Sequence, residues 1–161
     1  MRAMAKSDAD KGEKLIASNR KAFHEYHVLE RQEAGLALTG TEVKSLREGR
    51  ANLSDSYVIV KGGEAFLLNA HISPYTHGNR ENHDPLRTRK LLLHRREIDK
   101  IASAVRDKGL SVVPLRLYFR RGIVKVEVAV VRGKKLHDKR EAERTREADR
   151  EAASAMKRER G

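Results

Sequence analysis

The fold is decided by residues 115–130, LRLYFRRGIVKVEVAV. On each side of Arg121-Gly122, large apolar residues alternate with polar or small ones. Successive side chains of a strand point to opposite faces, and a Gly-containing pair between two such runs favours a tight turn. The stretch therefore predicts a two-stranded antiparallel ribbon with one apolar face.

Two further stretches predict strands. Residues 57–60 and 65–68 are apolar and flank Lys61-Gly-Gly-Glu64, which predicts a second hairpin. Residues 23–38 predict a strand or a bent pair of strands, with Gly35 marking a bulge.

Helices are predicted at two places. Residues 39–42, TGTE, fit a capping box that opens a short helix, and Gly49 is placed to end it. Apolar residues at helical spacing from Ile98 to Val105 predict an amphipathic helix that ends near Gly109. Many short strands with a few helices in a chain of this size predict a mainly β, α+β fold built on a small closed antiparallel barrel.

The chain divides into three regions by composition. Residues 1–18 are polar and are expected to form a flexible leader, and residues 19–132 carry nearly all large apolar residues. Residues 133–161 are expected to be a basic tail that is disordered when free, because they hold too little apolar surface to offset the entropy of ordering. The tail is nevertheless rich in Ala, Glu, Lys and Arg, and so can become helical on a partner.

The net charge points to a polyanionic partner. The chain carries 35 Lys+Arg and 23 Asp+Glu, a formal charge of +12, which is typical of proteins that bind nucleic acid or an anionic membrane surface. It contains no Cys, which excludes disulfides, Cys-zinc sites and a thiol nucleophile. No run of about 18 apolar residues and no signal-peptide core occur, so a cytoplasmic protein is expected.

The densest basic cluster combines Arg87-Thr-Arg-Lys90 with His94-Arg-Arg96. With the alternating Arg116, Tyr118 and Arg120, it predicts a phosphate-binding surface, because arginine binds phosphate through two parallel hydrogen bonds and tyrosine stacks on bases. A solvated strand face is the alternative interpretation of the arginine stripe.

Two patterns are weak candidates for metal chemistry. His24 and His27 are three residues apart, which on a strand places them on opposite faces, so a zinc site is disfavoured. Glu42-Val-Lys44 is similar to the acid-x-Lys signature of some nucleases, with Asp55 or Asp84 as a second acidic ligand, but an exposed helix face explains it better. No P-loop, G-x-S-x-G or G-x-G-x-x-G is present, so neither an enzyme nor a bound cofactor or metal is expected.

Several stretches, taken together and in order, resemble the SmpB family, the SsrA-binding proteins of bacterial trans-translation. They are residues 19–22, NRKA; 24–26, HEY; 33–38, EAGLAL; 40–47, GTEVKSLR; 51–57, ANLSDSY; 87–93, RTRKLLL; and 133–140, GKKLHDKR.

The resemblance implies an oligonucleotide-binding (OB)-like barrel that binds the tRNA-like domain of transfer-messenger RNA (tmRNA). It also implies partners that act on the same RNA: alanyl-tRNA synthetase, elongation factor Tu with GTP, and the decoding centre and mRNA channel of a stalled ribosome. In this reading the tail occupies the empty mRNA channel, the nascent peptide is tagged for degradation, and the ribosome is rescued.

Site residues follow from the resemblance by position. Glu33 and Leu92 match positions of the family's RNA-binding surface, where a buried acid can accept hydrogen bonds from a base or ribose, and His94 stands where some members have Asn. The RNA-binding set expected here is Glu33, Arg87, Arg89, Lys90, Leu92 and His94. The decoding-centre set expected in the tail is Gly133, Lys134, Lys135, His137, Asp138, Lys139 and Arg140.

Two other hypotheses remain open from the sequence. One is a generic ribosomal or initiation-factor-like RNA-binding module that has no role in the decoding centre. The other is a metal-dependent nuclease that uses Glu42 and Lys44. Residues 133–140 separate the first hypothesis from the resemblance, because a generic module has no use for that motif.

Overall fold

The computed structural model describes residues 12–76 and 82–134 of the chain. The strands in chain order are β1 (Glu13–Ser18), β2 (Tyr26–Leu36), β3 (Ala51–Asn52), β4 (Tyr57–Lys61), β5 (Glu64–Leu68), β6 (His71–Ile72), β7 (Arg89–Leu92), β8 (Ser111–Arg120) and β9 (Ile123–Gly133). The helices are α2 (Arg20–Glu25), α3 (Gly40–Arg47) and α4 (Arg95–Lys108).

The hairpin of β8 and β9 forms as its alternating pattern predicts, with Arg120 opposite Ile123. Its turn residues Arg121 and Gly122 both have positive φ, 50° and 81°. Such a turn matches the natural twist of the two strands. The hairpin of β4 and β5 also forms where it was predicted, with Lys61 opposite Glu64.

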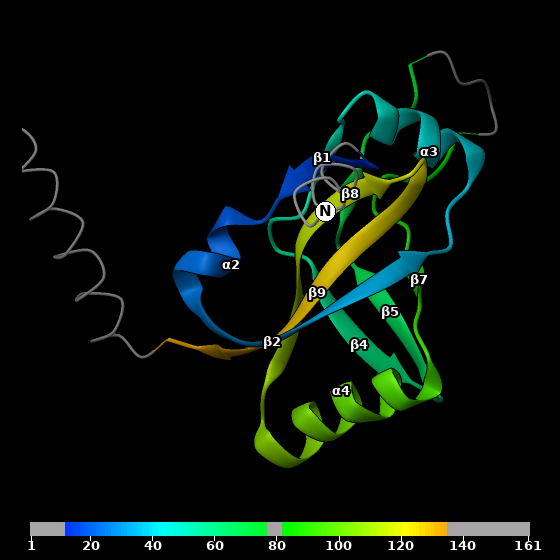
Figure 1. The fold of residues 1–161 in the computed structure, drawn as a ribbon. Coiled ribbons are helices and arrows are strands. Elements are labelled where there is room, and N and C mark those ends of the chain that lie inside the picture. The colour runs from blue at the N-terminus through cyan, green and yellow to red at the C-terminus, as the bar shows by residue number, and fades with distance from the viewer. Residues whose placement is uncertain (1–11, 77–81, 135–161) are drawn as a thin grey trace, which may run out of the picture.

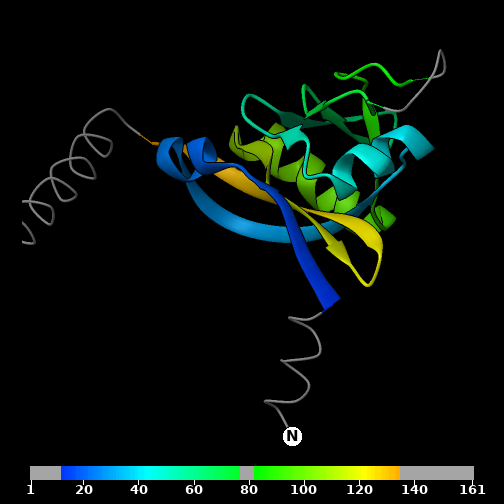
Figure 2. The same cartoon turned by 90° about the horizontal axis from the view of Figure 1, so that it is seen from above.

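Seven strands form one antiparallel sheet in the order β1-β8-β9-β2-β7-β5-β4, and β3 pairs with β6 in a second small sheet. The long strands β8, β9 and β2 cross the centre of the molecule (Figure 1). Seen from above, β2 bends strongly as it passes from α2 toward α3 (Figure 2). The mainly antiparallel α+β class predicted from the sequence is thus confirmed.

Closure of the barrel is not confirmed. β1 and β4 are the two edges of the sheet, and no pairing joins them within the part of the chain that the structure describes. β4 instead lies beside β8, whose first residues pair only with β9. The sheet therefore curls around its core but stays open along a seam between β4 and β8.

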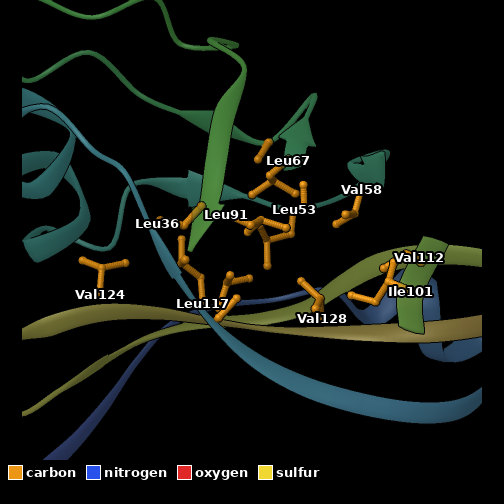
Figure 3. Close-up of a cluster of buried hydrophobic side chains, with 14 of the residues drawn as sticks. Leu36, Leu53, Val58, Leu67, Leu91, Ile101, Val112, Leu117, Val124 and Val128 are labelled. Atoms are coloured by element: carbon orange, nitrogen blue, oxygen red, sulfur yellow. The ribbon is translucent and has the colours of Figure 1, made fainter. Parts of the chain in front are cut away.

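The main hydrophobic core lies inside this curled sheet. It contains Leu67, Leu91, Leu117 and Val128, which converge from different strands (Figure 3). The helices α3 and α4 lie at opposite ends of the sheet and add Leu46 and an Ile98–Ile101 pair to the core (Figure 1). Burial of these aliphatic side chains stabilises the fold by about 25 cal/mol per Å² of apolar surface.

A second, smaller core forms on the outer face of the β8–β9 hairpin. Val113, Leu115, Ala129 and Val131 face Ala22 of α2 there. A shift of register between Pro114 and Arg116 accompanies this change, so the hairpin is buried on both faces at this end. The prediction of a single apolar face was therefore wrong for this half of the hairpin.

The flexible leader predicted for residues 1–18 is wrong for its last six residues. Residues 13–18 form β1, which pairs with residues 116–120 of β8. Ile16 and Ala17 pack against the main core, and this packing orders a segment whose polar composition suggested flexibility. Residues 1–11 lie outside the described residues.

Helix ends follow the sequence signals closely. Thr39 and Glu42 form the predicted capping box of α3, and Gly109 ends α4 in the left-handed conformation with φ of 63°. The bulge in β2 lies between Val28 and Glu30, not at Gly35. Within residues 12–76 and 82–134, no helix has the length and apolar content that a bilayer crossing needs.

Candidate nucleic-acid interface

One continuous outer face extends over the neighbouring strands β8, β9, β2 and β7. The registers place Arg116 opposite Glu127, Glu127 opposite Glu33, and Gly35 opposite both Lys125 and Leu92. Because side chains alternate along a strand, these residues and their second neighbours share one side of the sheet. The structure thus brings together the predicted site residues Glu33, Lys90 and Leu92.

Glu33 lies at the centre of this face and is held from two sides. The hydroxyl of Tyr118 donates a hydrogen bond to Glu33 Oε2. Arg120 Nη1 lies 3.0 Å and 2.9 Å from the two carboxylate oxygens of Glu33. The carboxylate is partly exposed, not buried as the sequence suggested, so it is both fixed in position and reachable from solvent.

Tyr118 itself is only 2% exposed, because neighbouring side chains cover its ring. The guanidinium carbon of Arg116 lies 4.5 Å from the ring centroid, in a cation–π contact. Burial, together with the hydrogen bond to Glu33, raises the pKa of the Tyr118 phenol. The phenol therefore remains a proton donor, and its covered ring is not available for the base stacking that the sequence suggested.

The arginine stripe is paired with acidic residues. Glu13 lies 3.8 Å from Arg116 and 3.6 Å from Arg120, and Glu127 lies 3.6 Å from Arg116 and 3.4 Å from Arg31. These pairs are at the surface, where an ion pair contributes only about 0–1 kcal/mol. A phosphate can therefore compete for the arginines at little cost.

Leu92 lies on this face beside a glycine. A Cβ atom at Gly35 would come 3.2 Å from the Cβ of Leu92, so the absence of a side chain at Gly35 allows Leu92 to lie close over β2. Leu92 is 53% exposed, so its side chain is accessible on this face. An apolar side chain in that place can pack against a ribose or a base.

The basic side of the face continues from β7 into α4. Lys90 Nζ lies 3.0 Å from Glu64 Oε1 in an exposed pair. His94 is the exposed N-cap of α4, and its backbone N–H donates to Glu97 Oε1 at 2.8 Å. Arg95 follows with a side chain that is 79% exposed. The start of α4 therefore adds cationic side chains close to Leu92 in the chain.

The predicted contact through Arg89 is corrected by its burial. Arg89 is 0% exposed, and its guanidinium binds the Glu42 carboxylate and donates to Ala70 O at 2.7 Å. Its role in this structure is to join β7 to α3 from inside. The basic run that contains it looked uniformly exposed in the sequence, but Arg89 and Leu91 alternate with Lys90 and Leu92 and point inward.

Arg87 lies at the edge of the same buried network. Its Nη2 lies 2.7 Å from Glu42 Oε1 and 3.0 Å from Ala37 O. Burial by itself would raise the pKa of Glu42, but hydrogen bonds from Arg87, the Thr39 backbone and Arg89 outweigh it and hold that pKa at about 2. Arg87 is half-buried, so it shares its guanidinium between this network and the surface.

The buried network of Glu42, Arg87 and Arg89 also tests two expectations from the sequence, namely that Glu42 lies on an exposed helix face and that Glu42 and Lys44 could form a nuclease site. Glu42 is fully buried, so the expected exposed helix face was wrong, and its two oxygens are already occupied by arginines. This arrangement leaves no room for the nuclease role of Glu42 and Lys44. In the described residues, no cluster of His, Asp or Glu has the geometry of a metal site, and this includes the surroundings of His24 and His27.

The tail set is only partly described. Gly133 ends β9, and the backbone N–H of Lys134 donates to Glu25 O at 2.9 Å. This bond holds the end of β9 next to α2. Lys135, His137, Asp138, Lys139 and Arg140 lie outside the described residues, together with the rest of the predicted tail.

Sequence reasoning missed several members of the face, namely Glu13, Arg31, Lys125 and Glu127. The alternation of Lys125 and Glu127 with valines was visible and could have placed both on the polar side of β9. Glu13 could not be found in the same way, because nothing local shows that β1 pairs with β8.

Comparisons with known proteins agree on one family. The model of the SmpB protein family matches residues 16–158. An SsrA-binding protein of Geobacter sulfurreducens is 58% identical over 146 residues, which cover 91% of this chain and 95% of the relative. Those of Geotalea uraniireducens and Geobacillus kaustophilus are 61% and 58% identical, over 90% and 91% of this chain and 96% of each relative.

A solved structure is also similar. The matching chain was solved under the heading "tmRNA-SmpB: a journey to the center of the bacterial ribosome". It is 48% identical in sequence, with a TM-score of 0.64 over 74% of this chain and 85% of that one.

Proposed function

The chain belongs to the SmpB family of SsrA-binding proteins, which are RNA-binding proteins and not enzymes, and from that premise we propose that it binds the tRNA-like domain of tmRNA and acts with it in ribosome rescue. The observation that carries this proposal is the outer face with Glu33 at its centre. It combines a fixed, accessible acceptor, an exposed leucine and weakly paired arginines on one rigid sheet.

Each part of the face has a use in binding a folded RNA. Arg116, Arg120 and Lys90 neutralise phosphates, and Leu92 packs against a ribose or base. Glu33 accepts a hydrogen bond from a 2′-OH or a base amino group, because a carboxylate fixed in one place can recognise a single donor. A folded RNA is recognised in this way by its shape and its 2′-hydroxyls more than by its sequence.

The expected RNA-binding set is assigned accordingly. Glu33, Lys90, Leu92, His94 and the outer part of Arg87 contact the RNA, whereas Arg89 supports them from inside. We place the protein in the cytoplasm, where alanyl-tRNA synthetase charges the bound RNA and elongation factor Tu with GTP delivers it to a stalled ribosome.

The tail completes the proposal. Gly133 to Arg140 enter the decoding centre of the small subunit, and the residues after them follow the empty mRNA channel as a helix. When mRNA fills the channel, the tail loses its contacts and the cost of ordering it is not offset. The tail thus tests whether the channel is empty before the nascent peptide is tagged.

Binding of purified protein to a transcript of the tRNA-like domain tests the central claim. The affinity should fall with salt by up to about 0.9 in log K per log salt for each neutralised phosphate. A linear single strand of the same length serves as the competitor that lacks the fold. Equal affinity for both RNAs would contradict recognition of a folded RNA and would favour the generic RNA-binding module.

A further inference from the structure

A pocket of about 370 Å³ lies at the open seam of the sheet, and none of the RNA-binding residues assigned above lines it. It is lined by α2, the turn before β4, and the first residues of β8. The pocket exists because β4 and the start of β8 lie side by side without pairing. Its volume is within the range of about 300–1,000 Å³ that is usual for small-ligand sites.

The walls of the pocket combine apolar and polar groups. The lining residues include the apolar Val58 and Val113 and the aromatic Tyr26 and Tyr57. Tyr57 is 40% exposed, so its ring is accessible to a planar ligand. Aromatic rings next to apolar side chains are the surfaces on which unpaired bases stack.

A pair of opposite charges stands at the pocket. Lys21 Nζ of α2 lies 2.7 Å from Asp55 Oδ1 of the turn before β4. The Asp55 side chain is 74% exposed, and pairs so exposed add little to stability, so the carboxylate can exchange its partner at low cost. Asp55 also has a positive φ of 64°, a conformation in which Asp and Asn are enriched among residues other than Gly.

We infer that this pocket binds a single unpaired guanine base of the partner RNA. The base stacks on Tyr57, the Asp55 carboxylate accepts from its N1–H and its 2-amino group, and the released Lys21 ammonium binds a neighbouring phosphate. Guanine is the choice because it is the one standard base with two adjacent donors on its Watson–Crick edge. The inference rests on the proposed function, since it assumes an RNA partner.

The pocket lies close to the start of the predicted tail. Glu25, which lines the pocket, accepts the backbone hydrogen bond from Lys134 at the point where the tail begins. A base bound there lies next to Lys134, at the start of the predicted tail. An unpaired guanine in either the tRNA-like domain or the ribosomal decoding region can supply this chemistry.

Amide chemical shifts of the full-length protein, measured during titration with free nucleotides, test the pocket itself. Guanosine monophosphate should give saturable shifts at Lys21, Ser56 and Val113. Inosine monophosphate lacks the 2-amino group and should bind more weakly, as should the A, C and U nucleotides. Equal responses to all five nucleotides, or no saturable response, would overturn the inference.

Asp55→Asn is the decisive variant, because Asn accepts the same positive φ but loses one acceptor. The guanosine response should weaken by about 5- to 150-fold, the usual effect of a lost bidentate contact. Asp99→Asn, in the exposed Arg95–Asp99 pair of α4, is the matched control and should bind like wild type. An unchanged response of Asp55→Asn would overturn the assignment.

Two RNAs then identify the source of the base. The tRNA-like domain and a decoding-centre rRNA hairpin are titrated separately, and the RNA that moves the pocket amides in wild type but not in Asp55→Asn supplies the guanine. If both RNAs bind and neither moves these amides, the pocket inference fails while the function proposed for the Glu33 face stands. If wild type binds neither RNA, the proposed function fails as well.

Discussion

The hydroxyl of Tyr118 on β8 donates a hydrogen bond to the carboxylate of Glu33 on β2, across the intervening strand β9. Tyr118 is buried under Arg116, whereas Glu33 is partly exposed. A buried donor thus holds an accessible acceptor in one orientation. This relationship gives Glu33 the rigidity that recognition of a single RNA group requires.

We expect Glu33→Ala to weaken binding of the tRNA-like domain by about 1–3 kcal/mol, the usual cost of leaving hydrogen-bond partners unpaired. Tyr118→Phe should cause a smaller loss, because Glu33 keeps its bonds to Arg120. Binding titrations and thermal melts of both variants measure this. Normal binding combined with an early melt would show that Glu33 is structural only.

Leu92→Ala is expected to reduce RNA affinity by roughly 1–2 kcal/mol through lost apolar contact, with a change in folding stability below about 0.5 kcal/mol. Leu86→Ala is the matched control, because Leu86 is 52% exposed and Leu92 is 53% exposed. Binding and denaturant unfolding are measured for both. Equal loss of affinity in the two variants would remove Leu92 from the interface.

The predictable part of the fold is the part whose signals are local. Residues adjacent in sequence determine both hairpins, the capping box of α3 and the glycine that ends α4. The sequence predicted all of them correctly. The inward turn of Arg89 depends on Glu42, a residue 47 positions away. Whether the sheet closes into a barrel likewise depends on how β4 and β8 lie relative to each other in space, and no local sequence pattern predicts that arrangement.

For the candidate site, the sequence identified Glu33, Lys90 and Leu92, which the sheet places on one face. It could not show that Tyr118 and the arginines of β8 are already engaged by Glu33, Glu13 and Glu127. Those contacts arise from strand register, which a single strand does not encode.

Glu42→Gln should destabilise the fold by about 3–5 kcal/mol, because it leaves the buried charge of Arg89 uncompensated. Glu64→Gln breaks the exposed pair with Lys90 and should cost less than about 1 kcal/mol. Denaturant unfolding at neutral pH compares the two. Similar small losses would show that the buried network contributes little.

The same network predicts an acid dependence. The pKa of Glu42 is about 2 in the folded chain, below its ordinary value of 4.5, so between these values the unfolded state binds more protons than the folded state. The stabilisation from Glu42 is therefore fully present above pH 4.5 and is lost as the pH falls toward 2. Glu42→Gln should show a shallower fall of unfolding free energy in this window, and an equally steep fall would contradict the assignment.

The last prediction concerns the tail, whose residues 141–156 contain neither Gly nor Pro. A lone helix of this length is marginal in water, so we expect it to form only where contacts along the channel offset the cost of ordering. Ala148→Pro removes a helix hydrogen bond and clashes with the preceding turn, at a cost of about 3 kcal/mol or more. RNA binding by the body should be unchanged, and peptide tagging on stalled ribosomes should fall sharply.

Ala148→Gln is the control at the same position, because Gln is a good helix former and should keep tagging near the wild-type level. His137→Ala should also spare RNA binding but impair an earlier step, accommodation in the decoding centre. Tagging of a stalled nascent chain is measured for all three variants, with RNA binding in parallel. Full tagging by Ala148→Pro would mean that the tail acts through its charge alone, because a tail that cannot form a continuous helix would still function in the mRNA channel.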